Sequence, residues 1–217
     1  METLRVPILA ERILSHLSTQ DMQSVCLVSK AWNSKFREAL SLYYSLMNKR
    51  IQALEKEQLK RKEFFAKHQK ESESDRMQLK FIEKLSLTEL RAFSKPPQAV
   101  KLIIELVTVL VTGKKCTEWS KTLLRTEHRL LDKLSNFDIT QANPKAVREV
   151  RKVLKQSDLT EQTVRRFSLA CSQIFAWLDS TSYLCEIFHY ANQFNQKIED
   201  LRAKKSEIGR LLKLSNP

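Results

Sequence analysis

The chain has 217 residues, of which 29% are charged and only two are glycine, and its formal net charge is +13. So few glycines exclude a fold rich in tight hairpin turns or phosphate-binding loops and favour long helices. No segment is long and apolar enough to span a membrane, and the N-terminal residues do not form a signal peptide, so we expect a soluble cytoplasmic protein.

The excess of basic residues predicts attraction to a polyanion, and most of this excess lies between residues 46 and 182. Nucleic acid, an acidic membrane surface and an acidic protein polymer all fit the sign of the charge. Nucleic acid is disfavoured because the basic residues are not interleaved with exposed aromatic residues and no recognised nucleic-acid-binding pattern occurs.

Cysteines and histidines give no indication of a metal site or a catalytic centre. The four cysteines form no C-x-x-C pair, and the four histidines lie apart from them on helical patterns. No Ser/His/Asp, Cys/His or paired-carboxylate arrangement stands out. We therefore expect neither an enzyme nor a bound metal or cofactor.

Two short helices are expected in residues 6–32, where apolar residues recur at helical spacing. Ser18 or Thr19 can cap the second helix, with Asp21 in its first turn. An ordinary helical hairpin is one interpretation, but the order of residues also resembles an F-box: a proline-led start, an Ile-Leu pair, a Leu-Ser turn, an acidic residue and a later tryptophan. The resemblance implies contacts with the adaptor subunit of a cullin-based ubiquitin ligase through Pro7, Ile8, Leu9, Ile13, Leu14, Val25, Val28 and Trp32.

A long exposed helix is expected in residues 46–95, because neither glycine nor proline occurs there. Its apolar residues follow the alternating spacing of a coiled coil, but the seam passes through polar positions. We interpret the polar stretch 67–75 as a frayed or register-tolerant section, with a solvated helix or linker as the alternative. The seam consists of Met47, Ile51, Leu54, Gln58, Arg61, Phe65, Leu79 and Ile82.

A second coiled-coil seam occupies the C-terminal arm, residues 183–217, with alternating steps of four and three. It consists of Ile187, Ala191, Phe194, Ile198, Leu201, Lys205, Ile208 and Leu212. Such a seam needs a partner. Because the two arms flank the middle of the chain, we expect them to pair antiparallel within one molecule; homodimerisation through the C-terminal arm is the alternative.

Between the arms, residues 96–182 are expected to form a small helical bundle. Pro96 and Pro97 end the preceding long helix, because proline lacks a backbone donor and restricts the residue before it. A nearly all-apolar helix follows and ends near Gly113.

Asn143 and Pro144 indicate the cap and first residue of a basic helix. Its outer face is expected to carry Lys145, Arg148, Arg151, Lys152 and Lys155. A last helix is expected to begin near Thr160 or Glu161 and to run without a break into the C-terminal arm.

Four stretches of the chain stand out by their residue order, namely LSLTELRAFSKPPQAVKLIIELVTVL (85–110), TEWSKTLL (117–124), NFDITQANPKAVREVRKVL (136–154) and VRRFSLACSQIFAWLDSTSYLCEI (164–187). They resemble the microtubule-binding domain of dynein heavy chains with its coiled-coil stalk. They occur in the family's order and span about half of the chain. The paired prolines before Val-Lys-Leu and the Ser-Leu-Ala-Cys sequence make the resemblance specific.

The resemblance implies an all-α fold in which a small helical bundle lies at the tip of an antiparallel two-helix coiled-coil stalk. We divide the chain into an F-box-like segment (1–45), a first stalk helix (46–95), a microtubule-binding bundle (96–182) and a second stalk helix (183–217). No G-x-x-x-x-G-K-[ST] motif is present, so motor activity is not expected.

By position, the resemblance implies tubulin contacts at Lys101, Arg148, Arg151, Lys152, Arg165 and Arg166. The expected function is a non-motor microtubule-binding adaptor of the cytoskeleton, including a cilium or axoneme, that links a ubiquitin-ligase adaptor to microtubules. The alternative is a protein scaffold whose dynein-like tip no longer binds tubulin and recognises a ciliary or dynein-associated partner.

Overall fold

The computed structural model describes residues 13–26, 30–115 and 117–214, and every regular element within them is helical. This confirms the expected all-α fold class. The α-helices are α2 (Thr19–Cys26), α3 (Lys30–Gln78), α4 (Lys84–Ala92), α5 (Gln98–Thr112), α6 (Leu123–Thr126), α7 (Leu130–Ser135), α8 (Pro144–Gln156), α9 (Glu161–Arg165) and α10 (Leu169–Leu214). The 3-10 helices are η1 (Leu79–Phe81), η2 (Trp119–Lys121) and η3 (Ile139–Gln141).

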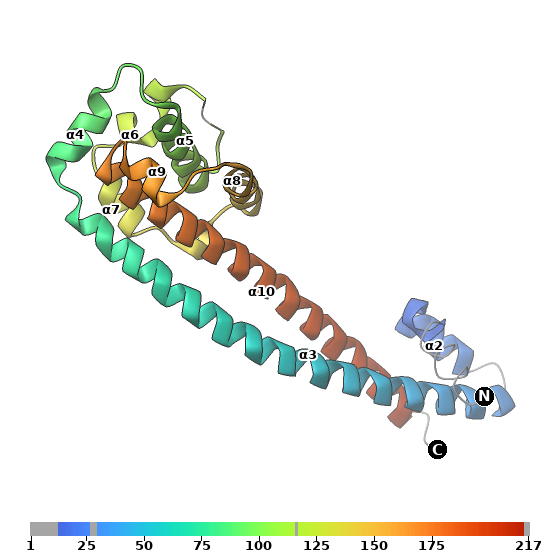
Figure 1. Ribbon diagram of the computed structural model, residues 1–217. Coiled ribbons are helices and arrows are strands. Elements are labelled where there is room, and N and C mark those ends of the chain that lie inside the picture. Colours follow the sequence, from blue (N-terminus) through green and yellow to red (C-terminus); the bar gives the residue numbers. More distant parts are fainter. Residues whose placement is uncertain (1–12, 27–29, 116, 215–217) are drawn as a thin grey trace. The chain divides into compact units, whose positions relative to one another are not determined.

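The chain divides into two compact units, each with its own hydrophobic core. The terminal unit contains residues 1–60 and 193–217, and the central unit contains residues 61–192. Parts of α3 and α10 belong to each unit, whereas α4 to α9 belong to the central unit alone (Figure 1).

In the terminal unit, α3 and α10 pair antiparallel, as expected from the two seams. Gln58 Nε2 donates to Asn195 Oδ1 at 2.6 Å, and Lys205 Nζ donates to Asn48 Oδ1 at 2.6 Å. Lower-numbered residues of α3 therefore meet higher-numbered residues of α10. Lys205, a polar member of the C-terminal seam, thus lies against a polar partner.

The N-terminal segment, described from residue 13 to residue 26, contains α2 and packs against this helix pair through Leu14 and Met22. At the start of α2, the Ser18 Oγ accepts a hydrogen bond from the Asp21 backbone N–H at 3.1 Å, while the Asp21 carboxylate accepts one from the Ser18 N–H at 3.0 Å. The Ser18 Oγ also donates to Asp21 Oδ2 at 2.6 Å, and this hydrogen bond together with the one from the Ser18 N–H lowers the pKa of Asp21. Ser18 therefore caps α2, as predicted. The core of the terminal unit consists of Leu14, Met22, Leu40, Tyr43, Met47, Ile208 and Leu211.

In the central unit, α3 ends earlier than the sequence predicts. We expected one helix over residues 46–95, but α3 stops at Gln78, Ile82 adopts an extended conformation and α4 starts at Lys84. The break turns α4 into the bundle, where the Arg91 guanidinium donates to backbone carbonyl oxygens at 2.8 Å. These long-range contacts override the local preference for a continuous helix.

The polar stretch 67–75 is helical throughout, which corrects its interpretation as a frayed section and agrees with the alternative of a helix. Its seam is polar but packed. The His68 ring lies edge-on to Tyr183 of α10 at 4.9 Å between centroids, and the buried hydroxyls of Ser72 and Thr181 are 3.3 Å apart. Paired polar groups replace apolar contacts here, because a buried hydroxyl is tolerated once it has a hydrogen-bond partner.

The nearly all-apolar α5 is the centre of the bundle and packs against α6 and α8. It ends, as predicted, at Gly113, whose φ of 70° is the left-handed conformation that glycine adopts most readily. The hydroxyl of Thr108 accepts a hydrogen bond from the Leu123 N–H at 3.0 Å, which ties the start of α6 to α5.

The predicted start of α8 is confirmed, because the Asn143 side chain accepts a hydrogen bond from the Lys145 N–H at 2.9 Å and Pro144 is the first helical residue. The last helix is not continuous, in contrast to our expectation. α9 ends at Arg165, and α10 begins after Ser168, whose Oγ accepts from the Cys171 N–H at 3.2 Å. The hydroxyl of Ser168 satisfies an orphan donor of α10, which allows a new helix start inside the sequence pattern of one helix.

Candidate functional site

Lys101 is the fourth residue of α5, and its side chain is 44% exposed. Its ammonium Nζ is 3.7 Å from the carboxylate of Glu105, one turn further along the helix. Burial raises the pKa of Glu105, and the nearby Lys101 charge counteracts part of that rise. Lys101 is therefore available at the surface, but an acidic neighbour accompanies it.

The three α8 candidates occupy different environments. Arg148 and Lys152 are exposed on the surface. Arg151 is 12% exposed and faces inward, where its Nη1 donates to Asp179 Oδ1 at 2.5 Å and its guanidinium lies 5.0 Å from the centre of the Tyr183 ring. The structure thus engages Arg151 within the molecule, between α8 and α10.

Further cations on α8 and near it also have acidic partners. Lys155 Nζ is 3.3 Å from Glu186 Oε1 on α10, and Lys115 Nζ is 3.0 Å from Glu149 Oε1 on α8. The sequence pattern predicts basic residues on the outer face of α8, but it does not reveal that Lys155 meets Glu186 of α10 or that Glu149 of α8 meets Lys115, because each pair joins residues more than thirty positions apart. Part of the charge on this face is consequently neutralised.

Arg165 and Arg166 are exposed where α9 gives way to α10. The large apolar side chains of Phe167 and Leu169 are next to them and are 54% and 56% exposed. No feature of the sequence distinguishes these two from core residues, so they were not among the candidates. The exposed surface at this connection combines two cations with two apolar side chains.

All six candidate cations belong to the central unit. The packing of α5 against α8 makes the helix of Lys101 a neighbour of the helix that carries Arg148 and Lys152. Arg165 and Arg166 are adjacent to each other on a separate segment of the same unit.

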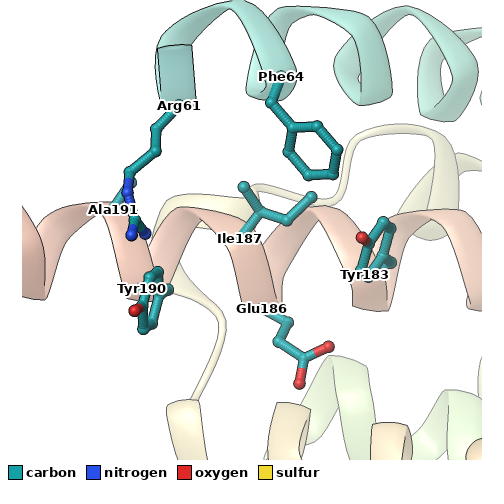
Figure 2. A pocket seen from close by; sticks show the side chains of 7 residues that line it. All are labelled: Arg61, Phe64, Tyr183, Glu186, Ile187, Tyr190 and Ala191. Carbon is teal, nitrogen blue, oxygen red and sulfur yellow. The ribbon is translucent and has the colours of Figure 1, made fainter. Parts of the chain in front are cut away.

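A hollow of about 300 Å³ lies between α3 and α10 in the central unit. Figure 2 shows Arg61 reaching from α3 toward Tyr190, with the guanidinium 4.6 Å from the ring centre, and Phe64 above Ile187. The only acid in its lining is Glu186, which already pairs with Arg151 and Lys155. The lining groups are those of a packed aromatic seam and not of a catalytic site.

Within the described part of the chain, no cluster of His, Cys, Asp or Glu could hold a metal ion. None of the helices in that part has the length and apolarity needed to cross a bilayer.

The eight F-box candidates are only partly covered by the described residues. Leu14 is buried in the core of the terminal unit, whereas Ile13 is 54% exposed. The other predicted positions lie outside the described residues or have side chains that lie outside them, namely Pro7, Ile8, Leu9, Val25, Val28 and Trp32. The structure therefore places one apolar side chain of the N-terminal segment inward and its neighbour outward.

An all-α bundle built on an antiparallel helix pair, with cations on its exposed faces, defines a helical binding module. The chain belongs to the family of dynein stalk domains: the family model described as the microtubule-binding stalk of dynein motor matches residues 45–215. The match covers the entire central unit and most of the helix pair in the terminal unit.

Individual relatives agree with this family. The cytoplasmic dynein heavy chain of Dictyostelium discoideum is 28% identical over 130 residues, and dynein axonemal heavy chain 6 of Homo sapiens is 25% identical over 125 residues; each match covers 58% of this chain. The cytoplasmic dynein heavy chain of Caenorhabditis elegans is 23% identical over 137 residues, 60% of this chain. The chain spans only 3% of the length of these relatives.

A model of the F-box domain matches residues 6–40, which confirms the second resemblance. This match ends inside α3, and the dynein stalk match begins at residue 45 of the same helix. The two domain families therefore meet within one helix. Both matched domains are non-catalytic.

Proposed function

We propose that the chain is a non-motor microtubule-binding adaptor, in which the central unit binds tubulin and the N-terminal segment binds the adaptor subunit of a cullin-based ubiquitin ligase. The observation that carries this proposal is the dynein stalk match, which includes every element of the central unit. The chain would thereby bring ubiquitin-ligase activity to the cytoskeleton, including a cilium or axoneme.

The charge distribution supports tubulin as the partner of the central unit. Lys101, Lys152, Arg165 and Arg166 are cations with exposed or half-exposed side chains. Complementary charge between these cations and an acidic polymer speeds encounter and favours the correct orientation. Arg151 contributes through the fold, since its guanidinium is engaged by Asp179.

The arrangement of the terminal unit supports the second half of the proposal. The F-box match runs into α3 without a linker, and the exposed Ile13 offers an apolar side chain beside the buried Leu14. A pull-down with the purified adaptor subunit tests this half. Replacement of Ile13 by Asp should abolish capture without unfolding the chain, because this side chain is already exposed.

The decisive experiment on tubulin is microtubule co-sedimentation of the purified chain over a salt series. We expect salt-sensitive pelleting that is lost in the double variant Lys101→Glu and Arg166→Glu. The matched control reverses two exposed lysines of the terminal unit, Lys56→Glu and Lys60→Glu, which changes the net charge equally. Absence of wild-type pelleting at low salt, or equal loss in both variants, would contradict specific tubulin binding by the bundle.

A protein scaffold that recognises a ciliary or dynein-associated component is the second candidate function. The acidic partners of Lys101, Arg151 and Lys155 favour it, because they reduce the charge available for a polymer surface. In that case the central unit should capture a protein other than tubulin, and the capture should depend little on salt.

A further inference from the structure

At the connection between α9 and α10, small apolar side chains are buried and larger ones are exposed. Val164 and Ala170 are buried, at 0% and 2% exposure, whereas the larger Phe167 and Leu169 are 54% and 56% exposed. Burial of apolar area stabilises a fold in proportion to that area, so the largest apolar groups are normally placed inside. This segment instead presents its two largest apolar side chains to solvent.

Hydrogen bonds fix the chain before the exposed pair and between its two members. Before it, Thr160 and Thr163 form a reciprocal capping box that fixes α9, with hydrogen bonds of 3.2 and 2.9 Å. Between the two apolar residues, the Ser168 Oγ accepts from the Cys171 N–H at 3.2 Å and starts α10. Because both flanking helices are capped, the connection is preorganised, which reduces the entropy lost on binding.

The charge beside the pair indicates the nature of its partner. Arg165 and Arg166 directly precede Phe167 and are exposed. An apolar contact rimmed by cations fits a partner surface that is acidic around an apolar depression. The partner that we propose for the central unit, tubulin in a polymer, is acidic.

We infer that Phe167 and Leu169 form the apolar centre of the tubulin contact, with Arg165 and Arg166 as its charged rim. This inference rests on the proposed function and adds a class of contact to it. The cations steer the bundle to the polymer and make binding salt-sensitive, while the apolar pair supplies affinity that persists when salt screens the charges.

The chain contains a matched control for this pair. Phe81 and Leu85 in the central unit are also strongly exposed, at 75% and 67%, and have the exposed lysines Lys80 and Lys84 beside them. They therefore share the exposure and the positive surroundings of Phe167 and Leu169. None of the six predicted tubulin contacts lies in their segment.

The test measures microtubule affinity by co-sedimentation over a salt series for two double variants. In the variant Phe167→Ser and Leu169→Gln, affinity should fall about tenfold or more at every salt concentration, with an unchanged slope against log salt, because no charge is altered. In the control variant Phe81→Ser and Leu85→Gln, affinity should equal that of the wild type. Circular dichroism and thermal melting of both variants check that the fold is retained.

A third variant changes the charge of the rim. Arg165→Glu and Arg166→Glu together should reduce both the microtubule affinity and its slope against log salt. Wild-type affinity in the Phe167→Ser and Leu169→Gln variant would overturn the inference and leave the proposed function intact. A wild-type chain that does not pellet would instead refute the proposed function, and with it tubulin as the partner of this surface. Equal losses in the test and control variants would also overturn the inference.

Discussion

Arg151 of α8 donates from Nη1 to Asp179 Oδ1 of α10 at 2.5 Å. The sequence pattern indicates that both residues are helical, but it does not indicate that their side chains meet. The Arg151 Nε also lies 3.4 Å from Glu186 Oε2, and the guanidinium stacks near Tyr183. A planar guanidinium with two carboxylates and an aromatic ring is a geometry that lysine cannot reproduce. Arg151 therefore fastens α8 to α10.

Replacement of Arg151 by Ala should lower the free energy of unfolding by about 2 kcal/mol, since charged hydrogen bonds and a stacked contact are lost together. Urea denaturation followed by circular dichroism measures the change. Arg151→Lys should recover only part of it. Lys152→Ala, which removes an exposed neighbour, should leave stability unchanged; equal effects at the two positions would show that the Arg151 contacts contribute nothing specific.

Glu105 should make stability depend on pH. Burial raises the pKa of its carboxyl group, although the Lys101 ammonium, 3.7 Å from the buried Oε1, counteracts part of the rise. A group whose pKa is higher in the folded than in the unfolded chain stabilises the fold below its unfolded pKa, and this contribution is lost as the pH rises through the folded pKa.

The variant Glu105→Gln should therefore gain thermal stability relative to the wild type as the pH increases from about 4 to about 7. Melting temperatures of both proteins across this range provide the measurement. Glu89→Gln, at an exposed position of α4, is the control and should show no such trend. If the difference in melting temperature between Glu105→Gln and the wild type is the same at every pH, ionisation of Glu105 does not destabilise the fold.

Cys171 and Cys185 should be unreactive in the folded protein. Both are completely buried, and burial raises the pKa of each thiol to about 12. Since the thiolate is the reactive form, alkylation by iodoacetamide at mildly alkaline pH should be slow until the chain is denatured. Mass spectrometry of digested protein locates the modified residues. Rapid labelling of both cysteines in the native protein would show that the central core opens readily.

The core of the terminal unit should depend on the end of α10. Ile208 is fully buried together with Leu14 and Met22 of the N-terminal segment. Ile208→Ala should cost about 2 to 4 kcal/mol, because it removes buried methyl groups and leaves a cavity.

The same substitution should speed proteolytic cleavage within the N-terminal segment, because that segment loses part of its packing surface. Limited proteolysis with identification of the cut sites checks this result. Leu59→Ala is the control, since this side chain is 61% exposed on α3 of the same unit. An unchanged digestion pattern for Ile208→Ala would show that packing against Ile208 does not protect the N-terminal segment from proteolysis.

Helix ends that depend on local chemistry were predictable. Ser18, Asn143 and Gly113 fix the ends of α2, α8 and α5 through a side-chain cap or a left-handed backbone, and each of these interactions involves residues within one or two turns. The two seams were likewise visible, because burial on one face of a helix imposes a periodicity on the sequence.

Breaks and side-chain directions that depend on distant elements were not predictable. The end of α3 at Gln78 follows from the packing of α4 against the bundle through Arg91, a residue that forms its hydrogen bonds more than thirty positions away. The direction of Arg151 depends in the same way on Asp179, and the helical pattern alone assigned that arginine to the outer face.

By itself the sequence determined the helical class, the family of the bundle and the set of its basic residues, because these follow from periodicity, local capping and residue order. The antiparallel pairing of the two arms within one chain was one of two arrangements that the sequence allowed. Only the tertiary structure decided which cations have acidic partners and which apolar side chains remain exposed, as for Phe167 and Leu169. The physical reason is that burial and charge pairing depend on distances between elements, and sequence spacing does not specify those distances.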